Sequence, residues 1–162
     1  MKYRYIASPV GRLLLAGQTD FLEIIGFPEG KGLVRPGEDW VVDDLVFVKA
    51  ENQLNEYFRG ERQEFDLELR PSGTPFQLSV LGALTQIPYG ESVAYKDIAQ
   101  SIGRSRAVRA VGAASARNPL PIVIPCHRVI GSNGSLTGFG GGVLAKSFLL
   151  NLEAVYSNYV CL

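Results

Sequence analysis

The sequence predicts an α+β protein with two domains: a small antiparallel sheet with one helix over residues 1–70, and a helical domain over residues 71–162. Three observations support this. Short β-prone runs separated by turns fill residues 1–27, capped helices follow residue 74, and the turn-forming segment RPSGT lies between the two regions. A chain of 162 residues, 46% of them apolar, can bury one substantial core or two small ones.

The N-terminal region is expected to form a meander. The runs KYRYIAS (2–8), RLLLAG (12–17) and LEIIGF (22–27) are rich in aliphatic and aromatic residues, and turn-forming residues separate them. Residues 65–69, FDLEL, alternate between apolar and acidic side chains, which predicts a further edge or half-buried strand.

One helix is predicted between the meander and that last strand. Asp43 or Asp44 can cap its N-terminus, and it should run to about Arg59, with Gly60 ending it. The apolar stripe that would pack on the sheet consists of Phe47, Ala50, Leu54 and Tyr57.

The C-terminal region opens with a strong helix signal. Thr74 as N-cap, Pro75 at the first helical position and Gln77 three residues past the cap form a capping box. The apolar positions Phe76, Val80 and Leu84 follow, and the helix should stop before Ile87-Pro88.

Two short helices come next, and their arrangement resembles a helix-turn-helix. The segment 94–103 gives a helix ended by Gly103, and Ser105 can cap a second helix over 106–117. In such a motif the second helix enters a groove of DNA, and here it would carry basic side chains. A helical hairpin with surface arginines is also ordinary structure. The basic residues concerned are Arg106, Arg109 and Arg117.

Charge is divided unevenly along the chain. Residues 1–75 hold 9 basic and 13 acidic residues, and residues 76–162 hold 7 basic and 3 acidic, giving net charges of −4 and +4. A basic C-terminal region favours a polyanionic partner, although chance clustering on solvated faces gives the same count. No apolar stretch approaches the roughly 20 residues of a membrane span, so we expect a cytoplasmic protein, associated with the nucleoid in a prokaryote.

The segment PIVIPCHRVI, residues 121–130, carries the most unusual chemistry. Cys126 is followed by the only histidine of the chain, His127, and by Arg128, within an apolar stretch. These neighbours could lower the pKa of the thiol and stabilise the thiolate, which is the nucleophilic species. A cysteine by itself is more often an inert buried residue. With Cys126 and Cys161 as the only cysteines, neither a zinc site nor a disulfide framework is expected.

An imidazole that accepts a proton from a thiol needs an acidic group to orient it. Glu153 is the best candidate, because it is one of three acidic residues after position 75 and lies on the predicted helix 143–155. A solvated carboxylate near a helix end is the alternative. The packing stripe of this helix is predicted to be Leu144, Phe148, Leu149 and Leu152.

The motifs together resemble the O6-alkylguanine-DNA alkyltransferases. IPCHRV, preceded by RAVGAASARNPLPIV and followed by GSNGSLTGFGGG, carries the resemblance, and SPVGRLLLAG, LEIIGF, GTPFQLSVLGALTQIPYGESVAYKDIA and LLNLE extend it over nearly the whole chain. The resemblance implies a ribonuclease H-like N-terminal domain and a winged-helix C-terminal domain. It also implies repair of DNA by irreversible transfer of an alkyl group to the protein's own cysteine, once per molecule.

By this resemblance, Cys126 accepts the alkyl group, His127 acts through a water as its base, and Glu153 holds the imidazole. Asn118 ties the helix-turn-helix to the segment that carries the cysteine. Tyr95 reaches the guanine ring and helps to rotate the nucleotide out of the duplex, which must precede chemistry on a stacked base.

The DNA contacts follow from the same resemblance. Arg109 enters the vacated stack, whereas Arg106, Arg117 and Arg128 are assigned to contacts with the DNA. The small residues Ala107 and Ala110, with Gly112, Ala113 and Ala114, let the helix approach a groove closely, although an Ala-rich helix packed on its own core has the same composition.

The glycine-rich loop 131–142 is expected to cover the base pocket. The carbonyls of Cys126 and Val129 would accept from the guanine amine, the Gly140 amide would donate toward O6, and Phe139 and Gly141 would line the pocket. Phe139 stands where many members have Tyr, and Gly140 where Ser or Ala is frequent, which leaves the range of alkyl groups open.

The expected partner is double-stranded DNA containing O6-alkylguanine, bound by a monomer without cofactor or metal. Two other hypotheses stay open. A non-catalytic relative would bind alkylated DNA but lack the cysteine, whereas a Cys-His hydrolase would draw its histidine from a distant part of the chain.

Overall fold

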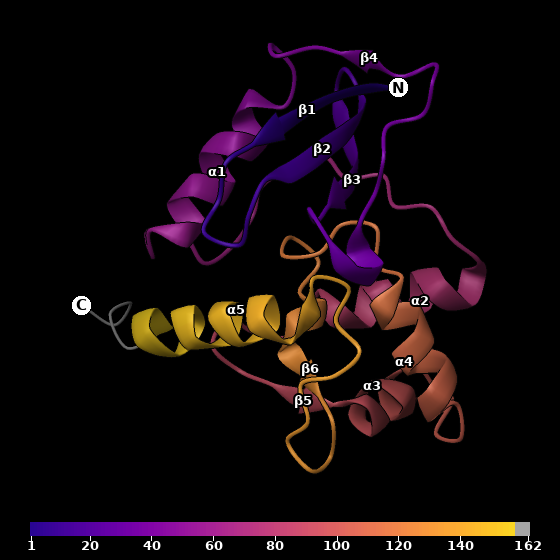
Figure 1. Ribbon diagram of the computed structural model, residues 1–162. Helices are drawn as coiled ribbons and strands as arrows, with labels where there is room; N and C mark the ends of the chain where they lie inside the picture. The colour runs from indigo at the N-terminus through magenta and orange to yellow at the C-terminus, as the bar shows by residue number, and fades with distance from the viewer. Residues whose placement is uncertain (158–162) are drawn as a thin grey trace.

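The computed structural model describes residues 1–157, and Cys161, which we interpret as an incidental free thiol, lies outside them. A small sheet and helix α1 (Val48–Phe58) form one layer, and the C-terminal helices form the other (Figure 1). One apolar core spans both regions, from Ile6 on the first strand to Leu149 on the last helix. No helix in this described part is long and apolar enough to cross a membrane.

The meander is present as predicted. Strands β1 (Lys2–Ile6), β2 (Leu13–Gln18) and β3 (Phe21–Gly26) pair antiparallel in sequence order. A two-residue strand, β4 (Val41–Val42), joins the outer edge of β1 in parallel, so the order is β3-β2-β1-β4. We did not predict β4, because both of its side chains are exposed and carry no burial pattern.

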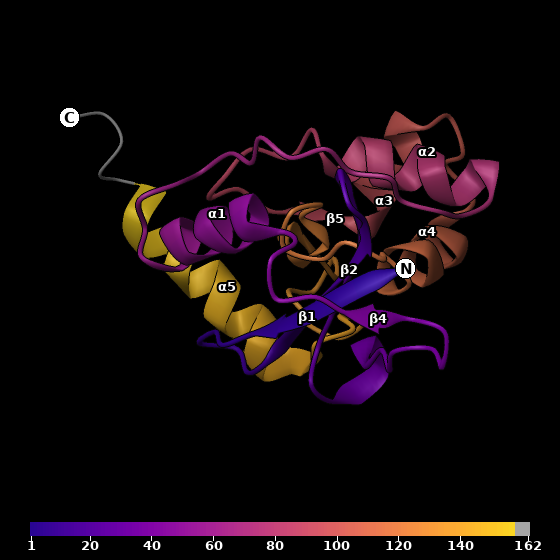
Figure 2. The ribbon, with the colours of Figure 1, turned by 90° about the horizontal axis from the view of Figure 1, so that it is seen from above.

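Helix α1 lies against the sheet with Ala50, Leu54 and Tyr57 buried (Figure 2). The predicted Asp43 or Asp44 cap is wrong, because the N-cap is Phe47 in the left-handed region without a side-chain cap. Asp43 instead accepts a hydrogen bond from the Leu45 amide and pairs with Lys2. Gly60 does end the helix, at φ 75°, and any side chain there would collide with the Tyr156 ring at 2.3 Å.

Residues 65–69 do not form the predicted strand. Only one bridge, Leu22 to Leu69, joins this segment to the sheet. The side chain of Gln53 on α1 makes two bonds to the Asp66 backbone, accepting from its amide at 2.9 Å and donating to its carbonyl at 3.0 Å. Phe65, Leu67 and Leu69 still pack against the core. The Gln53 side chain makes the two backbone hydrogen bonds that a neighbouring strand would otherwise provide.

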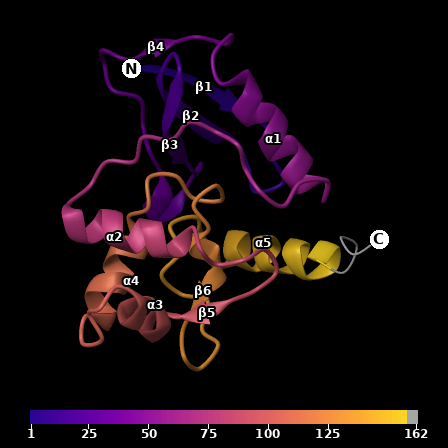
Figure 3. The same ribbon diagram turned by 180° about the vertical axis from the view of Figure 1, so that it is seen from behind.

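The C-terminal region begins with α2 (Pro75–Leu84), and the predicted capping box is present. The Gln77 amide donates to the Thr74 hydroxyl at 3.2 Å, and the Thr74 amide donates to the Gln77 side chain at 3.0 Å. Helices α3 (Tyr95–Ser101) and α4 (Val108–Ala116) pack on α2 (Figure 3). The predicted Ser105 cap is wrong, because Ala107 is the N-cap of α4 and makes no side-chain bond.

The remaining elements surround the cysteine segment. They are the 3-10 turns η1 (Gly30–Gly32) and η2 (Cys126–Arg128), the parallel strand pair β5 (Val93–Ala94) and β6 (Val129–Ile130), and the helix α5 (Gly142–Tyr156).

The predicted packing stripe of α5 is partly wrong. Leu144 is 87% exposed, while Lys146, Leu149 and Glu153 form the buried stripe. These three positions recur at helical spacing, so they share one face, and Leu144 lies about 200° around the helix from Lys146. The helix therefore turns two charged side chains inward, toward η2.

Candidate active site

The turn that leads to Cys126 is held by one side chain. Asn118, just after α4, donates to the Ile124 carbonyl at 2.8 Å and accepts from the Leu120 amide at 2.9 Å. Ile122 has a φ of 76°, a conformation that strains a β-branched residue. The polar bonds of Asn118 thus fix a strained bend directly before the thiol.

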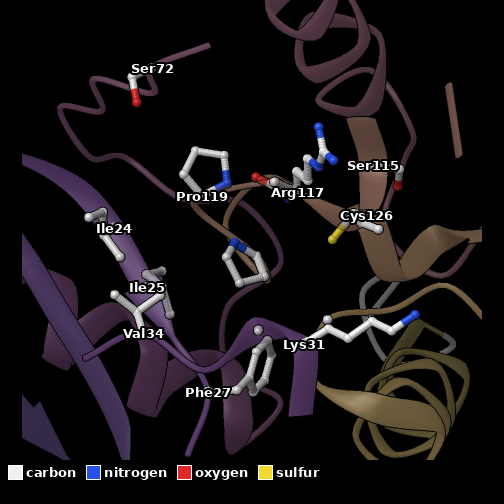
Figure 4. Close-up of a pocket in the computed structure, with 15 residues that line it drawn as sticks. Ile24, Ile25, Phe27, Lys31, Val34, Ser72, Ser115, Arg117, Pro119 and Cys126 are labelled. Atoms are coloured by element: carbon white, nitrogen blue, oxygen red, sulfur yellow. The ribbon is translucent and has the colours of Figure 1, made fainter. Parts of the chain in front are cut away.

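Cys126 is 5% exposed and lines a cavity of about 250 Å³ between the two regions (Figure 4). The opposite wall of this cavity comes from β3 and η1, and includes Ile24, Ile25, Phe27 and Gly32. Figure 4 shows the sulfur on the side of Cys126 that faces Pro119 and the other residues that line this cavity.

The thiol is not pre-ionised. Burial raises the pKa of Cys126 to about 11, and the Asn118 side chain and the charge of Lys146 only partly oppose this. Our expectation that His127 and Arg128 lower the pKa is therefore wrong, since burial outweighs every favourable neighbour. The resting site holds a neutral thiol that must lose its proton as it reacts.

His127 and Glu153 are in contact, as predicted from sequence. The Nε2 of His127 lies 2.6 Å from the Oε2 of Glu153, and both side chains are fully buried. Burial would raise the pKa of Glu153, but the hydrogen bonds and charges of His127 and Arg128 outweigh it and hold the pKa at about 2. Glu153 is therefore an ionised acceptor rather than a solvated helix-end carboxylate.

That ionisation fixes the tautomer of His127. A carboxylate can only accept, so Nε2 carries the hydrogen and Nδ1 presents its lone pair. Burial lowers the pKa of His127, and the opposing effect of Glu153 is smaller. The net lowering keeps the ring neutral. Nδ1 is buried and has no partner among the described residues, so the imidazole holds one free basic nitrogen in the interior.

Arg128 is turned into the interior of the protein. It is 6% exposed, and its guanidinium donates to both oxygens of Glu153 at 2.8 and 3.1 Å and to the Ile87 carbonyl at 2.7 Å. The expected DNA contact is therefore wrong. A bidentate pair with a buried carboxylate uses the guanidinium in place of phosphate.

Two residues of the site were missed from sequence. Tyr57 donates its hydroxyl to Glu153 Oε2 at 2.6 Å, and Lys146 donates to the Val129 carbonyl while its ammonium lies 5.8 Å from the centre of the Tyr95 ring. A signal for Lys146 was available, since it shares a helix face with Glu153 seven residues later. Tyr57 gave no such signal, because its spacing indicates only a core position.

Tyr95 begins α3 and lies under the glycine-rich loop. Its hydroxyl donates to the Thr137 carbonyl at 3.3 Å, and burial, followed by the charge of Cys126, raises its pKa. A Cβ on Gly112 of α4 would lie 3.9 Å from its ring. Tyr95 thus connects the loop, the thiol and the helix that carries the arginines.

The loop residues are closely packed. Phe139 stacks edge-on against Phe27 with ring centres 5.4 Å apart. The Gly140 carbonyl accepts from the Gly32 amide at 2.7 Å. A Cβ on Gly141 would lie 2.8 Å from both aromatic rings, so a side chain at this position would require these packed rings to shift.

The predicted DNA-facing residues lie on α4 and on the residues that flank it, because the helix begins at Val108, two residues later than predicted. Arg106, Arg109, Ala110 and Arg117 are exposed and Ala107 is half-buried. Other small residues of the helix, including Ala114, are buried and belong to the core. Among residues 1–157, no group of three or more His, Cys, Asp or Glu could hold a metal ion.

Comparisons with known proteins agree along the whole chain. Residues 1–71 match the family model "6-O-methylguanine DNA methyltransferase, ribonuclease-like domain", and residues 75–155 match the DNA binding domain of the same name. A methylated-DNA–protein-cysteine methyltransferase of Methanosarcina barkeri is 52% identical over 94% of this chain and 97% of its own length. One from Mycobacterium tuberculosis is 49% identical over 93% and 91%.

The fold comparison agrees with the sequence comparison. The crystal structure of Mycobacterium tuberculosis OGT in complex with DNA superposes with a TM-score of 0.91 and 47% identity, covering 96% of this chain and 94% of that one. A second structure, of the Mycobacterium tuberculosis O6-methylguanine methyltransferase, gives a TM-score of 0.89 at 47% identity, with coverages of 96% and 93%.

Proposed function

The chain belongs to the 6-O-methylguanine DNA methyltransferase family, and from this premise we propose that Cys126 is the acceptor of the alkyl group. Its activity is DNA repair by alkyl transfer to a cysteine. The observation that carries the assignment is the hydrogen-bonded His127–Glu153 pair that directly follows Cys126 in the chain. The cavity at Cys126 supports it, although of the residues assigned to the guanine pocket below only Cys126 and Gly140 line that cavity. We propose O6-alkylguanine in duplex DNA as the substrate.

The proposed reaction is an in-line displacement at carbon. A bond forms between sulfur and the alkyl carbon while the carbon–O6 bond breaks. The pKa of about 11 requires a base for the thiol, and the free Nδ1 of His127 supplies one through a water. The proton that sulfur loses balances the proton that guanine gains on leaving, so no co-reactant is needed.

Access to a stacked base requires extrusion of the nucleotide. We propose that Tyr95 presses on the extruded nucleotide and that the exposed Arg109 of α4 fills the vacated stack. Arg106 and Arg117, also exposed, are proposed to contact phosphates. Ala107 and Ala110 would allow the close approach of α4 to a groove.

The guanine pocket is proposed to lie between Tyr95 and the loop. The carbonyls of Cys126 and Val129 would accept from the guanine amine, and the Gly140 amide would donate toward O6. The Val129 carbonyl already accepts from Lys146, and its second lone pair would serve the base. Phe139 and Gly141 support this wall by packing on Phe27.

We further propose that the protein acts as a monomer in the cytoplasm, and on the nucleoid in a prokaryote. The domain boundary at residues 70 and 71 is likewise a proposal. The separate family-model matches over 1–71 and 75–155 support it.

A mass measurement tests the assignment of the acceptor. Duplex DNA containing O6-methylguanine should add one methyl group to the peptide that carries Cys126, once per molecule, because a thioether has no easy route back. Cys126→Ser should remove the modification. Continued turnover on excess substrate, or a methyl group on the peptide with Cys161, would contradict the proposal.

A further inference from the structure

The N-terminal region reaches into the proposed proton relay through one side chain. Tyr57, on the last turn of α1, is fully buried, and its hydroxyl donates to Glu153 Oε2 at 2.6 Å. Figure 1 shows α1 above α5, the helix that carries Glu153, with the last turn of α1 at its end nearer α5. The contact joins residues 96 positions apart. One of the hydrogen bonds to Glu153 therefore comes from the N-terminal half of the chain.

We propose that Tyr57 is a positioning residue of the alkyl-transfer reaction, which lowers the proton affinity of the Glu153–His127 pair so that the imidazole enters the reaction neutral with Nδ1 free. This inference rests on the proposed function of Cys126, because a relay matters only if the thiol must lose a proton.

The hydrogen bonds around Glu153 support this assignment. Oε1 accepts from the Arg128 Nε at 2.8 Å and from the Gly90 amide at 3.1 Å. Oε2 accepts from His127 at 2.6 Å, from Arg128 at 3.1 Å and from Tyr57. A carboxylate offers about four lone-pair directions, so these donors saturate it. Each of them favours the ionised form and opposes protonation of the pair.

The hydroxyl of Tyr57 is not explained by packing. Its ring contacts Phe58 and Phe65, with centres 5.5 Å apart in both cases, and Tyr89 at 6.2 Å. A phenylalanine ring could make these contacts equally well. Burial and then the Glu153 charge raise the pKa of Tyr57 well above its usual value, so the hydroxyl keeps its proton and acts as a donor.

Other ionisable groups also face the pair and stay in place in the variant below. Arg128 and Cys126 lie on η2 with His127, Lys146 lies on α5, Tyr95 on α3, and Tyr89 on the loop before β5, where its ring is 5.6 Å from the Arg128 guanidinium. Removal of the Tyr57 hydroxyl therefore deletes one hydrogen-bond donor to Glu153 and leaves the other ionisable groups around the pair unchanged.

Tyr57→Phe against Tyr89→Phe is a matched experiment. Both changes delete one buried phenolic hydroxyl near the same carboxylate, but the Tyr89 hydroxyl has no hydrogen-bond partner among the described residues. Free O6-benzylguanine needs no extrusion from a duplex. Its rate of alkyl transfer in Tyr57→Phe should fall by up to about tenfold on the acid limb of the pH–rate profile, because a rise of about one unit in the imidazole pKa lowers the neutral fraction up to about tenfold there. The acid limb of its pH–rate profile should move to higher pH, whereas Tyr89→Phe should leave both unchanged.

The single histidine of the chain supplies a readout that does not depend on activity. Nitrogen-15 NMR of the imidazole should show a hydrogen on Nε2 in the unmodified protein and a pKa that rises by up to about one unit in Tyr57→Phe. A uniform fall in rate with an unmoved acid limb and an unmoved imidazole pKa would overturn the proposal and leave Tyr57 a packing residue. Failure of the proposed function is distinguishable, because it would abolish transfer to Cys126 in every variant without affecting the NMR comparison.

Discussion

The two ends of the His127 ring lie in opposite surroundings. On the Nε2 side, Glu153 is saturated by donors from Tyr57, Arg128 and the Gly90 amide. On the Nδ1 side, the ring nitrogen has no partner among the described residues, and the nearby thiol borders a cavity. The difference indicates that the fold saturates the carboxylate that holds Nε2 and leaves Nδ1, the proposed base, unpaired on the side of the thiol.

Loss of the Glu153 carboxylate should have the largest effect on stability. Glu153→Gln leaves the buried Arg128 without its counter-charge, so the free energy of unfolding should fall by about 3–5 kcal/mol, measured by urea denaturation. Transfer to Cys126 should fall with it. Glu61→Gln removes a partner of Arg59 from a solvent-exposed pair and should change the unfolding free energy little. Equal losses in the two variants would show that burial of the Glu153 cluster contributes nothing special.

Acid should lower the free energy of unfolding gradually, as Glu153 becomes protonated. The folded pKa of Glu153 is about 2 against an ordinary value of 4.5, so its stabilisation is complete above about pH 4.5 and is lost as pH falls through about 2. The lowered pKa of His127 acts in the same direction, since the unfolded chain gains a proton below about pH 6.5 that the folded chain resists. Glu153 alone should account for roughly 3 kcal/mol.

Urea denaturation at a series of pH values between 7 and 2 measures this loss. The slope at the acid end should flatten in Glu153→Gln, because that variant has no carboxyl group to titrate. A protein that became more stable below pH 4 would contradict the ionised state of Glu153.

The effect of a change on the side of the thiol should be smaller and should concern reactivity more than stability. Lys146→Met removes the nearby positive charge that lowers the pKa of Cys126, so that pKa should rise further. Iodoacetamide labelling of the peptide with Cys126, followed by mass spectrometry across pH, measures it. Lys96→Met, on the exposed face of α3, is the control. An unchanged labelling profile would show that Lys146 only hydrogen-bonds the Val129 carbonyl and does not influence the thiol.

The members of the Cys126–His127–Glu153 group could be read from the sequence. The only histidine beside a cysteine, with few carboxylates downstream, was enough to select Glu153 as its partner. The other hydrogen-bond donors to Glu153 could not be predicted from the sequence. Tyr57 and Arg128 reach it across the fold, and a sequence cannot distinguish a buried guanidinium from one that faces DNA.

The errors in the fold have similar causes. The alternation at residues 65–69 predicted burial correctly, but Gln53 supplies backbone partners that a neighbouring strand would otherwise provide. The stripe of α5 was placed on Leu144 because apolar residues usually face the core. In this helix the buried face also includes Lys146 and Glu153, because both find hydrogen-bond partners in the interior.

The packing of the glycine-rich loop limits how this protein could be re-engineered. In a library randomised at residues 139–142, position 141 should return mostly glycine, because a side chain there would require two packed aromatic rings to shift. At position 140 the nearest obstacle is the Gly32 Cα at 3.2 Å, which a small shift of η1 would relieve. Position 140 should therefore accept more substitutions than position 141, and at both positions the limiting contacts include residues of the N-terminal region.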